Sequence, residues 1–207
     1  MSNEAPDPSR RRFLTGAATV VGGVGAVFAA VPFLGFLKPN VEARAVGAPI
    51  EVDVSKLAEG QRLEFEWKGS PVWVISRTQE HLNYLEDEAV LRGRLRDPDS
   101  EEDQQPEYAR NLYRSVSPEV LVVSPVCTHL GCIVVYYPGI EPQPFDNDWK
   151  GGFFCACHGA MYDMSGRVYS GTPAPSNLEV PPHRFVGDDK LVIGEDPEDP
   201  EQEVEAT

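Results

Sequence analysis

Two short segments with matching residue types restrict what this chain can fold into more than any other feature. They are Cys127-Thr128-His129-Leu130-Gly131-Cys132, the first hexad, and Cys155-Ala156-Cys157-His158-Gly159-Ala160, the second hexad, and together they hold all four cysteines and two of the four histidines. Each hexad offers one thiolate and one imidazole, namely Cys127 with His129 and Cys155 with His158. Mixed sulfur and nitrogen ligands suit either zinc or an iron–sulfur cluster in which histidines replace two cysteines. The sequence therefore predicts a metal site where the two hexads meet.

The two remaining cysteines distinguish between these metals. Structural zinc sites of two cysteines and two histidines usually lack further cysteines placed symmetrically beside them, whereas Cys132 and Cys157 lie at the rims of both hexads. This arrangement favours an iron–sulfur cluster, and a zinc site stays open as the alternative.

At these residues the chain resembles a known family. Cys-Thr-His-Leu-Gly-Cys followed by Cys-x-Cys-His-Gly is similar to the paired boxes of Rieske proteins, specifically the disulfide-containing kind from quinol-oxidising cytochrome bc complexes. The resemblance implies one [2Fe-2S] cluster, with the inner iron on Cys127 and Cys155 and the outer iron on His129 and His158. It also implies a disulfide between Cys132 and Cys157.

The N-terminal region has the composition of an export signal followed by a membrane anchor. Ser9-Arg10-Arg11-Arg12-Phe13-Leu14 lies in a twin-arginine-type signal region (1–15) and precedes an uncharged run over 16–37. A helix over that run would rise about 33 Å, enough to cross a hydrocarbon core of roughly 30 Å. By the positive-inside rule the N-terminus stays cytoplasmic, so we expect a single-pass inner-membrane protein with its head on the periplasmic side. A signal peptide cleaved near Ala43-Arg44-Ala45 is the alternative.

After the predicted anchor, the chain divides into a tether (38–49), a head (50–194) and an acidic tail (195–207). The tether has small residues and no apolar period. In the head, alternating apolar residues predict strands over 50–54 and 62–67, and apolar runs predict strands over 72–75, 120–123, 133–137, 153–154 and 191–193. Short strands punctuated by Gly and Pro favour a mainly β fold, an antiparallel β-sandwich with a small cluster-binding β subdomain over about 124–176.

The segment from Thr78 to Ser117 interrupts this pattern. Thr78 can cap a short helix with Leu82, Leu85 and Ala89 on one face, and residues 97–103 then read as a polar loop. The stretches 95–100 and 113–115 resemble a segment that precedes the first box in proteobacterial Rieske subunits, which extends the resemblance from the export signal to about Ile193.

The net charge of −15 is unevenly placed, and the last 13 residues alone hold seven acids and no base. Such a tail is typical of a disordered, solvated segment. The acidic balance argues against a nucleic-acid partner.

The family resemblance also implies a function. The chain would be the Rieske subunit of a respiratory or photosynthetic cytochrome bc complex, a quinol–cytochrome c reductase, and would be an oxidoreductase and translocase only as part of it. It would accept one electron and a coupled proton from quinol, with His129 or His158 taking the hydrogen bond of the quinol hydroxyl, and pass the electron to a c-type cytochrome. Its partners would be cytochrome b and that cytochrome, in a dimeric membrane complex.

Three alternatives come from other classes of protein. The small subunit of arsenite oxidase shares twin-arginine export, the disulfide and a Rieske cluster. A soluble oxygenase-type Rieske ferredoxin typically lacks the disulfide cysteines and the anchor, and a structural zinc module would carry no redox centre.

The resemblance assigns roles to four residues around the ligands. Leu130 would cover the cluster and face the quinone pocket, and Pro173, in Gly171-Thr172-Pro173-Ala174-Pro175, would belong to a loop that shields it. Tyr162 matches the tyrosine that bonds a cysteine sulfur. Ala160 stands where many high-potential members have a serine whose hydroxyl donates to a bridging sulfide, so we expect a lower potential here.

Overall fold

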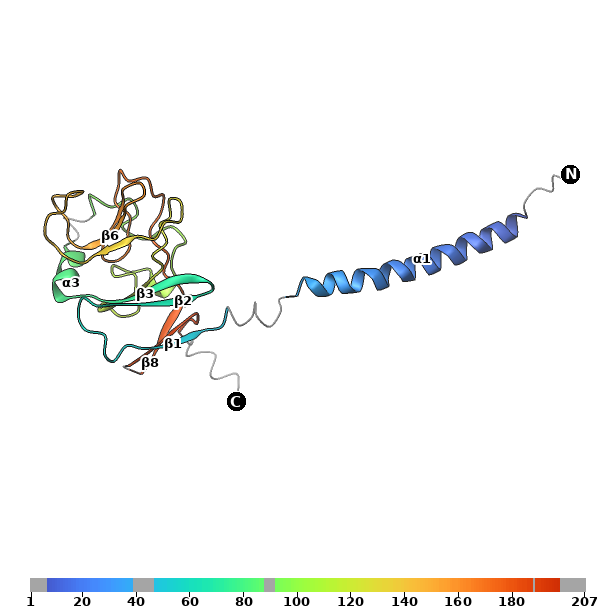
Figure 1. The fold of residues 1–207 in the computed structure, drawn as a ribbon, viewed down its shortest axis with the longest axis horizontal. Helices are drawn as coiled ribbons and strands as arrows, with labels where there is room; N and C mark the ends of the chain where they lie inside the picture. Colours follow the sequence, from blue (N-terminus) through green and yellow to red (C-terminus); the bar gives the residue numbers. More distant parts are fainter. Residues whose placement is uncertain (1–6, 39–46, 88–91, 188, 198–207) are drawn as a thin grey trace. The chain divides into compact units, whose positions relative to one another are not determined.

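The computed structural model of the protein describes residues 7–38, 47–87, 92–187 and 189–197 (Figure 1). The chain divides into two compact units, residues 1–45 and 46–207, which are described separately here. Of the predicted tether, residues 39–46 lie outside the described part of the chain, and only 195–197 of the predicted acidic tail are described.

The described part of the first unit, residues 7–38, contains one helix, α1 (Pro8–Phe36), whose 29 residues correspond to a length of about 43 Å. Asp7 caps the helix by accepting a hydrogen bond from the Ser9 N–H, and Pro8 occupies the first turn, where a missing N–H costs nothing. The helix begins before the predicted span at Gly16, so the arginines of the export signal lie on the same helix as the apolar run. It is long and apolar enough to cross a membrane, a test that a signal sequence also passes.

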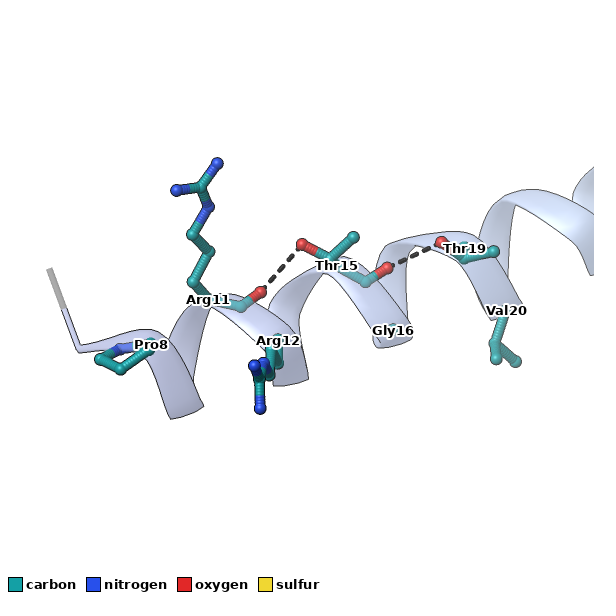
Figure 2. A pocket seen from close by; sticks show the side chains of 7 residues that line it. All are labelled: Pro8, Arg11, Arg12, Thr15, Gly16, Thr19 and Val20. Carbon is teal, nitrogen blue, oxygen red and sulfur yellow. Dashed lines mark hydrogen bonds between the residues drawn. The ribbon is translucent and has the colours of Figure 1, made fainter.

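A shallow groove follows one face of the N-terminal part of α1 (Figure 2). The hydroxyls of Thr15 and Thr19 on this face donate to the carbonyl oxygens of Arg11 and Thr15, at 2.9 Å in both cases. Because the helix itself satisfies these hydroxyls, Gly16 and the threonines present a surface of low polarity beside the arginines.

Within its described residues, the second unit contains three antiparallel sheets of three strands, which Figure 1 shows one above the other. The first sheet has the order β1 (Ile50–Asp53), β9 (Lys190–Ile193), β8 (His183–Val186). The second has the order β2 (Arg62–Trp67), β3 (Ser70–Ser76), β4 (Val120–Val123), and the third has the order β5 (Val135–Tyr137), β6 (Gly152–Cys155), β7 (Ala160–Tyr162). The antiparallel, mainly β fold predicted from the sequence is confirmed.

From Val72 onward, strand β3 of the second sheet is buried on both faces, whereas Arg62, Glu64 and Glu66 of the edge strand β2 are exposed. Successive side chains of a strand point to opposite faces, so Val72 and Val74 enter one hydrophobic core and Trp73 and Ile75 enter the other. The core that contains Val72 and Val74 also contains Leu191 of the β1–β9–β8 sheet. The core that contains Trp73 and Ile75 extends to the β5–β6–β7 sheet. A continuous apolar run in the sequence therefore corresponds to a strand packed on both sides.

The predicted helix after Thr78 is α3 (Gln79–Glu86). The Thr78 hydroxyl accepts from the His81 N–H while Nδ1 of His81 accepts from the Thr78 N–H, both at 3.2 Å, so each satisfies a free donor of the first turn. Leu82 and Leu85 are buried, and Ala89 lies outside the described residues. A short 3-10 helix, η1 (Glu107–Ala109), follows in the same segment.

Candidate metal centre

The two hexads form loops built on the same backbone turn. The N–H of Gly131 donates to the carbonyl of Cys127 at 2.9 Å, and the N–H of Gly159 donates to the carbonyl of Cys155 at 2.8 Å. Both glycines have a positive φ, 79° and 77°, a conformation that other residues rarely adopt. The sixth position then pairs back with the first, through a 2.7 Å bond from the Cys127 N–H to the Cys132 carbonyl and through the β6–β7 register of Cys155 with Ala160.

This turn separates the four candidate ligands by depth. The thiols of Cys127 and Cys155 are free and buried, with 2% and 1% exposure. His129 is half-buried and His158 is exposed, and their ring centroids lie 4.8 Å apart. The loops thus bring two sulfurs together on the inside and two imidazoles together toward the surface.

The donor set fits an iron–sulfur cluster with mixed ligands. Nδ1 of His129 is buried and has no hydrogen-bond partner among the described residues. A buried ring nitrogen without a partner is costly unless a metal or another group engages it. Burial also raises the pKa of the Cys155 thiol, and coordination by iron would offset that cost because a metal ligand must be the thiolate.

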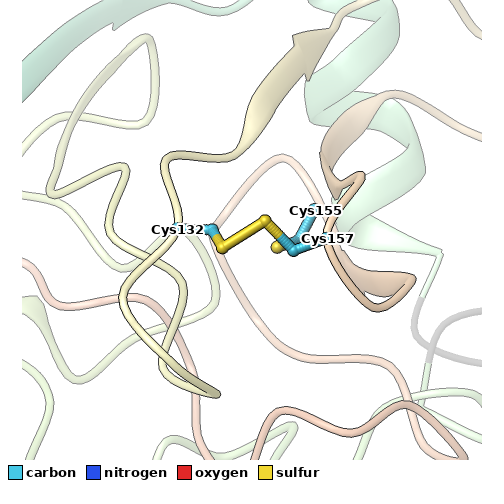
Figure 3. Close-up of side chains that lie close together, drawn as sticks. All are labelled: Cys132, Cys155 and Cys157. Atoms are coloured by element: carbon cyan, nitrogen blue, oxygen red, sulfur yellow. A yellow bond between two sulfur atoms is a disulfide. The ribbon is translucent and has the colours of Figure 1, made fainter.

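Cys132 and Cys157 form a disulfide that joins the two loops (Figure 3). The bond connects the last position of the first hexad to the third position of the second. The disulfide implied by the family resemblance is therefore present.

Tyr162, the last residue of β7, contacts the first loop through its hydroxyl group. Its hydroxyl oxygen lies 3.3 Å from Sγ of Cys127 and 3.2 Å from Oγ1 of Thr128, and it accepts the Thr128 N–H at 3.3 Å. Burial raises the pKa of Tyr162, so the hydroxyl keeps its proton and can donate it. Thr128 also donates to the carbonyl of Ser176 at 2.7 Å, which attaches the first loop to the segment after Pro173.

The other residues expected around the ligands lie as follows. Ala160 is fully buried at the start of β7, opposite Cys155. Leu130 is 70% exposed at the tip of the first loop. Pro173 is exposed, and the preceding carbonyl of Thr172 accepts a 2.8 Å hydrogen bond from Arg96.

A buried cluster of charged side chains, at the turn that follows β7, was not predicted from the sequence. Asp163 and Arg167 form an ion pair at 2.7 Å with 2% and 3% of their side chains exposed. Arg114, fully buried, donates to the carbonyls of Ser165 and Leu178. These bonds fix the turn that follows Tyr162, and the signal available in the sequence was the charged pair on either side of Gly166 in an otherwise apolar stretch.

Two protein families match the chain by their models. The model described as "Ubiquitinol-cytochrome C reductase Fe-S subunit TAT signal" matches residues 1–40, and the model of the Rieske [2Fe-2S] domain matches residues 94–182.

Curated relatives align over nearly the full length of the chain. The ubiquinol-cytochrome c reductase iron-sulfur subunit of Allochromatium vinosum is 46% identical over 95% of this chain and 93% of the relative. The protein of the same name from Bradyrhizobium diazoefficiens is 43% identical over 93% of this chain and 98% of the relative. Among solved structures, a chain of "Hyperthermophilic respiratory Complex III" is 28% identical, with a TM-score of 0.44, over 86% of this chain and 98% of that chain.

Proposed function

Because the chain belongs to the family of ubiquinol-cytochrome c reductase iron-sulfur subunits, we propose that the cysteine and histidine of each hexad hold its [2Fe-2S] cluster. The chain is a subunit of an oxidoreductase complex, as predicted from the resemblance of its two boxes. The proposed ligands are Cys127 and Cys155 for the inner iron and His129 and His158 for the outer iron.

One observation supports this assignment most strongly. The same glycine turn, used twice, buries one thiol of each loop and leaves two imidazoles 4.8 Å apart nearer the surface. Two thiolates and two neutral imidazoles on opposite sides of one site are the ligand set of a Rieske cluster. When bound, the cluster supplies a one-electron acceptor whose potential is higher than that of a centre with four cysteines.

The residues at the tip of the site suit a quinol. His158 is exposed and His129 half-buried, so a ring nitrogen that does not bind iron can accept a hydrogen bond from the quinol hydroxyl and then take its proton. Leu130, 70% exposed beside them, offers an apolar surface for the quinone ring. Two imidazoles and one leucine would thus bind and orient the head group.

Quinol oxidation by this subunit requires a protein that completes the quinol site and a protein that accepts the electron. We infer that cytochrome b supplies the rest of the quinol site and that a c-type cytochrome accepts the electron, in a dimeric membrane complex. The basic N-terminus of α1 and its apolar run support an anchor with a cytoplasmic N-terminus and a periplasmic head. Protease added to intact spheroplasts should therefore degrade the head, and protection of the head would contradict this orientation.

Purification from detergent-solubilised membranes tests the proposed function. Absorption and electron paramagnetic resonance spectra of one fraction should show a [2Fe-2S] centre together with b- and c-type haem, and quinol should reduce the centre. A fraction with stoichiometric zinc and no iron, or with neither haem, would contradict the proposal.

A further inference from the structure

Two segments from elsewhere in the chain hold the first hexad at Thr128. The N–H of Thr128 donates to the hydroxyl of Tyr162 at 3.3 Å, and the hydroxyl of Thr128 donates to the carbonyl of Ser176 at 2.7 Å. Tyr162 leads into a turn over residues 163–167, which hydrogen bonds to the carboxylate of Asp163 close. The position of the Tyr162 hydroxyl therefore depends on where this turn lies relative to the segment that carries Ser176.

The guanidinium of Arg114 connects the turn to that segment. Its Nη1 donates to the carbonyl of Ser165, in the turn, at 3.0 Å, and its Nη2 donates to the carbonyl of Leu178 at 2.7 Å. The N–H of Leu178 donates in addition to the carbonyl of Gly166 at 2.8 Å. A Cβ at Gly166 would lie only 3.2 Å from Nη1 of Arg114, so the glycine leaves room for the guanidinium. One side chain thus fixes the turn against the segment that carries Ser176.

Arg114 occupies a costly environment. Its side chain is fully buried, and its acceptors are three backbone carbonyls and Oε1 of Gln105, which lies 3.2 Å from Nε and 2.8 Å from Nη2. Its backbone φ is 48°, in the left-handed region that residues other than glycine rarely adopt. Such strain persists only where the surrounding contacts hold it, and it gathers at functional sites. The contacts of Arg114 therefore invite a functional explanation.

We propose that Arg114 is a positioning residue for the Tyr162 hydroxyl, and through it for the sulfur of Cys127, which lies 3.3 Å from that hydroxyl. The inference rests on the proposed function, in which Cys127 is a cluster ligand. Without the guanidinium the turn can shift against the segment of Ser176, and the Tyr162 hydroxyl moves with it. A longer hydrogen bond to the sulfur stabilises the reduced centre less, so the reduction potential falls.

A double-mutant cycle on the reduction potential tests the proposal. Redox titrations followed by electron paramagnetic resonance compare wild type, Arg114→Gln, Tyr162→Phe and the double variant, each as full-length protein in detergent-solubilised membranes. We expect Arg114→Gln to lower the potential by no more than Tyr162→Phe does. More than half of that shift should disappear in the Tyr162→Phe background, where no hydroxyl remains to be positioned.

The cycle also separates positioning from the loss of a positive charge. Burial lowers the pKa of Arg114 only to about 10, so the guanidinium is charged at neutral pH, and its removal alone disfavours the reduced centre. A charge acts through space whether or not the Tyr162 hydroxyl is present. A shift caused by charge would therefore be equally large in both backgrounds.

Two further variants keep the charge of Arg114 and carry the test if Arg114→Gln does not fold. Gln105→Ala removes the side-chain oxygen that accepts from Nε and Nη2, so the potential should fall by a smaller amount. Gln104→Ala is the matched control. This neighbouring, half-buried glutamine contacts Arg114 through its backbone carbonyl, at 3.3 Å, which the truncation leaves in place, so the potential should stay unchanged.

Contrary results distinguish this inference from the proposed function. An unchanged or raised potential in Arg114→Gln would overturn the inference, and so would a shift of which half or more remains in the Tyr162→Phe background. If Arg114→Gln does not fold, an unchanged potential in Gln105→Ala, or equal shifts in Gln105→Ala and Gln104→Ala, would overturn it. Wild-type protein without any [2Fe-2S] signal would overturn the proposed function instead.

Discussion

The hydroxyl of Tyr162 lies 3.3 Å from Sγ of Cys127 and accepts the backbone N–H of Thr128 at 3.3 Å. With its oxygen accepting from the backbone, the phenol can direct its proton at the sulfur. A donor to a ligand sulfur stabilises the more negative, reduced state of the centre and raises its potential.

We therefore expect Tyr162→Phe to lower the reduction potential. The loss of about 1 kcal/mol of hydrogen bonding to the sulfur corresponds to roughly 40 mV for a one-electron couple. A redox titration followed by electron paramagnetic resonance measures the change. Tyr169→Phe is the control, since the buried Tyr169 hydroxyl has no hydrogen-bond partner among the described residues, and an equal shift in both variants would refute the role given to Tyr162.

Ala160 is fully buried and pairs with Cys155 across the β6–β7 hairpin. A serine there would add a hydroxyl beside the sulfur ligands, so Ala160→Ser should raise the potential by a similar amount, roughly 40 mV. Ala109→Ser places a hydroxyl at another buried alanine, in η1, and should leave the potential unchanged. An unchanged potential in Ala160→Ser would sink the expectation that this chain has a lower potential than its serine-containing relatives.

The disulfide should stabilise the head. It joins residues 25 positions apart, and a loop of that size is worth about 3.5 kcal/mol by restriction of the unfolded chain. The double variant Cys132→Ser/Cys157→Ser leaves no unpaired partner and should lose that amount in urea unfolding of the cluster-loaded protein. A loss below about 1 kcal/mol would indicate that packing of the loops alone holds them together.

Much of the fold could be predicted from local sequence patterns. The strands β2 and β4 have the predicted bounds. The identity of Thr78 alone was enough to predict the N-terminal cap of α3, which the structure confirms. The predicted strand over 133–137 is shorter, because Ile133 forms only an isolated bridge with Val126 before β5 begins. The strand β8 was not predicted, because its sequence His-Arg-Phe-Val shows no clear alternation of apolar and polar residues.

The site could be predicted only in part. Each hexad contains its candidate ligands within six residues, so the spacing of cysteine and histidine in the sequence was enough to predict a metal site. The contacts of Tyr162 with Cys127 and of Arg114 with Ser165 join residues 35 and 51 positions apart. Family resemblance supplied the first of these, and nothing local indicated the second, because a lone arginine in a sequence does not reveal which carbonyls it will bind.

Stability should fall in acid because of His183. Nδ1 of this buried residue donates to the carbonyl of Pro181 at 2.8 Å, and burial lowers the pKa of the imidazole in the folded head. The unfolded chain then binds more protons, so the free energy of unfolding decreases as the pH falls below about 6.5, the ordinary value of histidine.

The pH series of melting temperatures tests this. His183→Gln should melt with a weaker dependence on pH between about 7 and 5 than the wild type. Burial lowers the pKa of His81 as well, so part of the dependence should remain. Parallel profiles for variant and wild type would rule out His183 as a source of the acid sensitivity.

The central claim is that one thiol and one imidazole from each hexad hold a two-iron cluster. Pulsed electron paramagnetic resonance of the reduced protein, prepared with ¹⁵N-labelled histidine, observes iron-bound nitrogen directly. We predict two coordinated histidine nitrogens, of which one is lost when His129 is replaced and the other when His158 is replaced. A reduced centre without coordinated nitrogen, or nitrogen couplings that survive both replacements, would contradict the account.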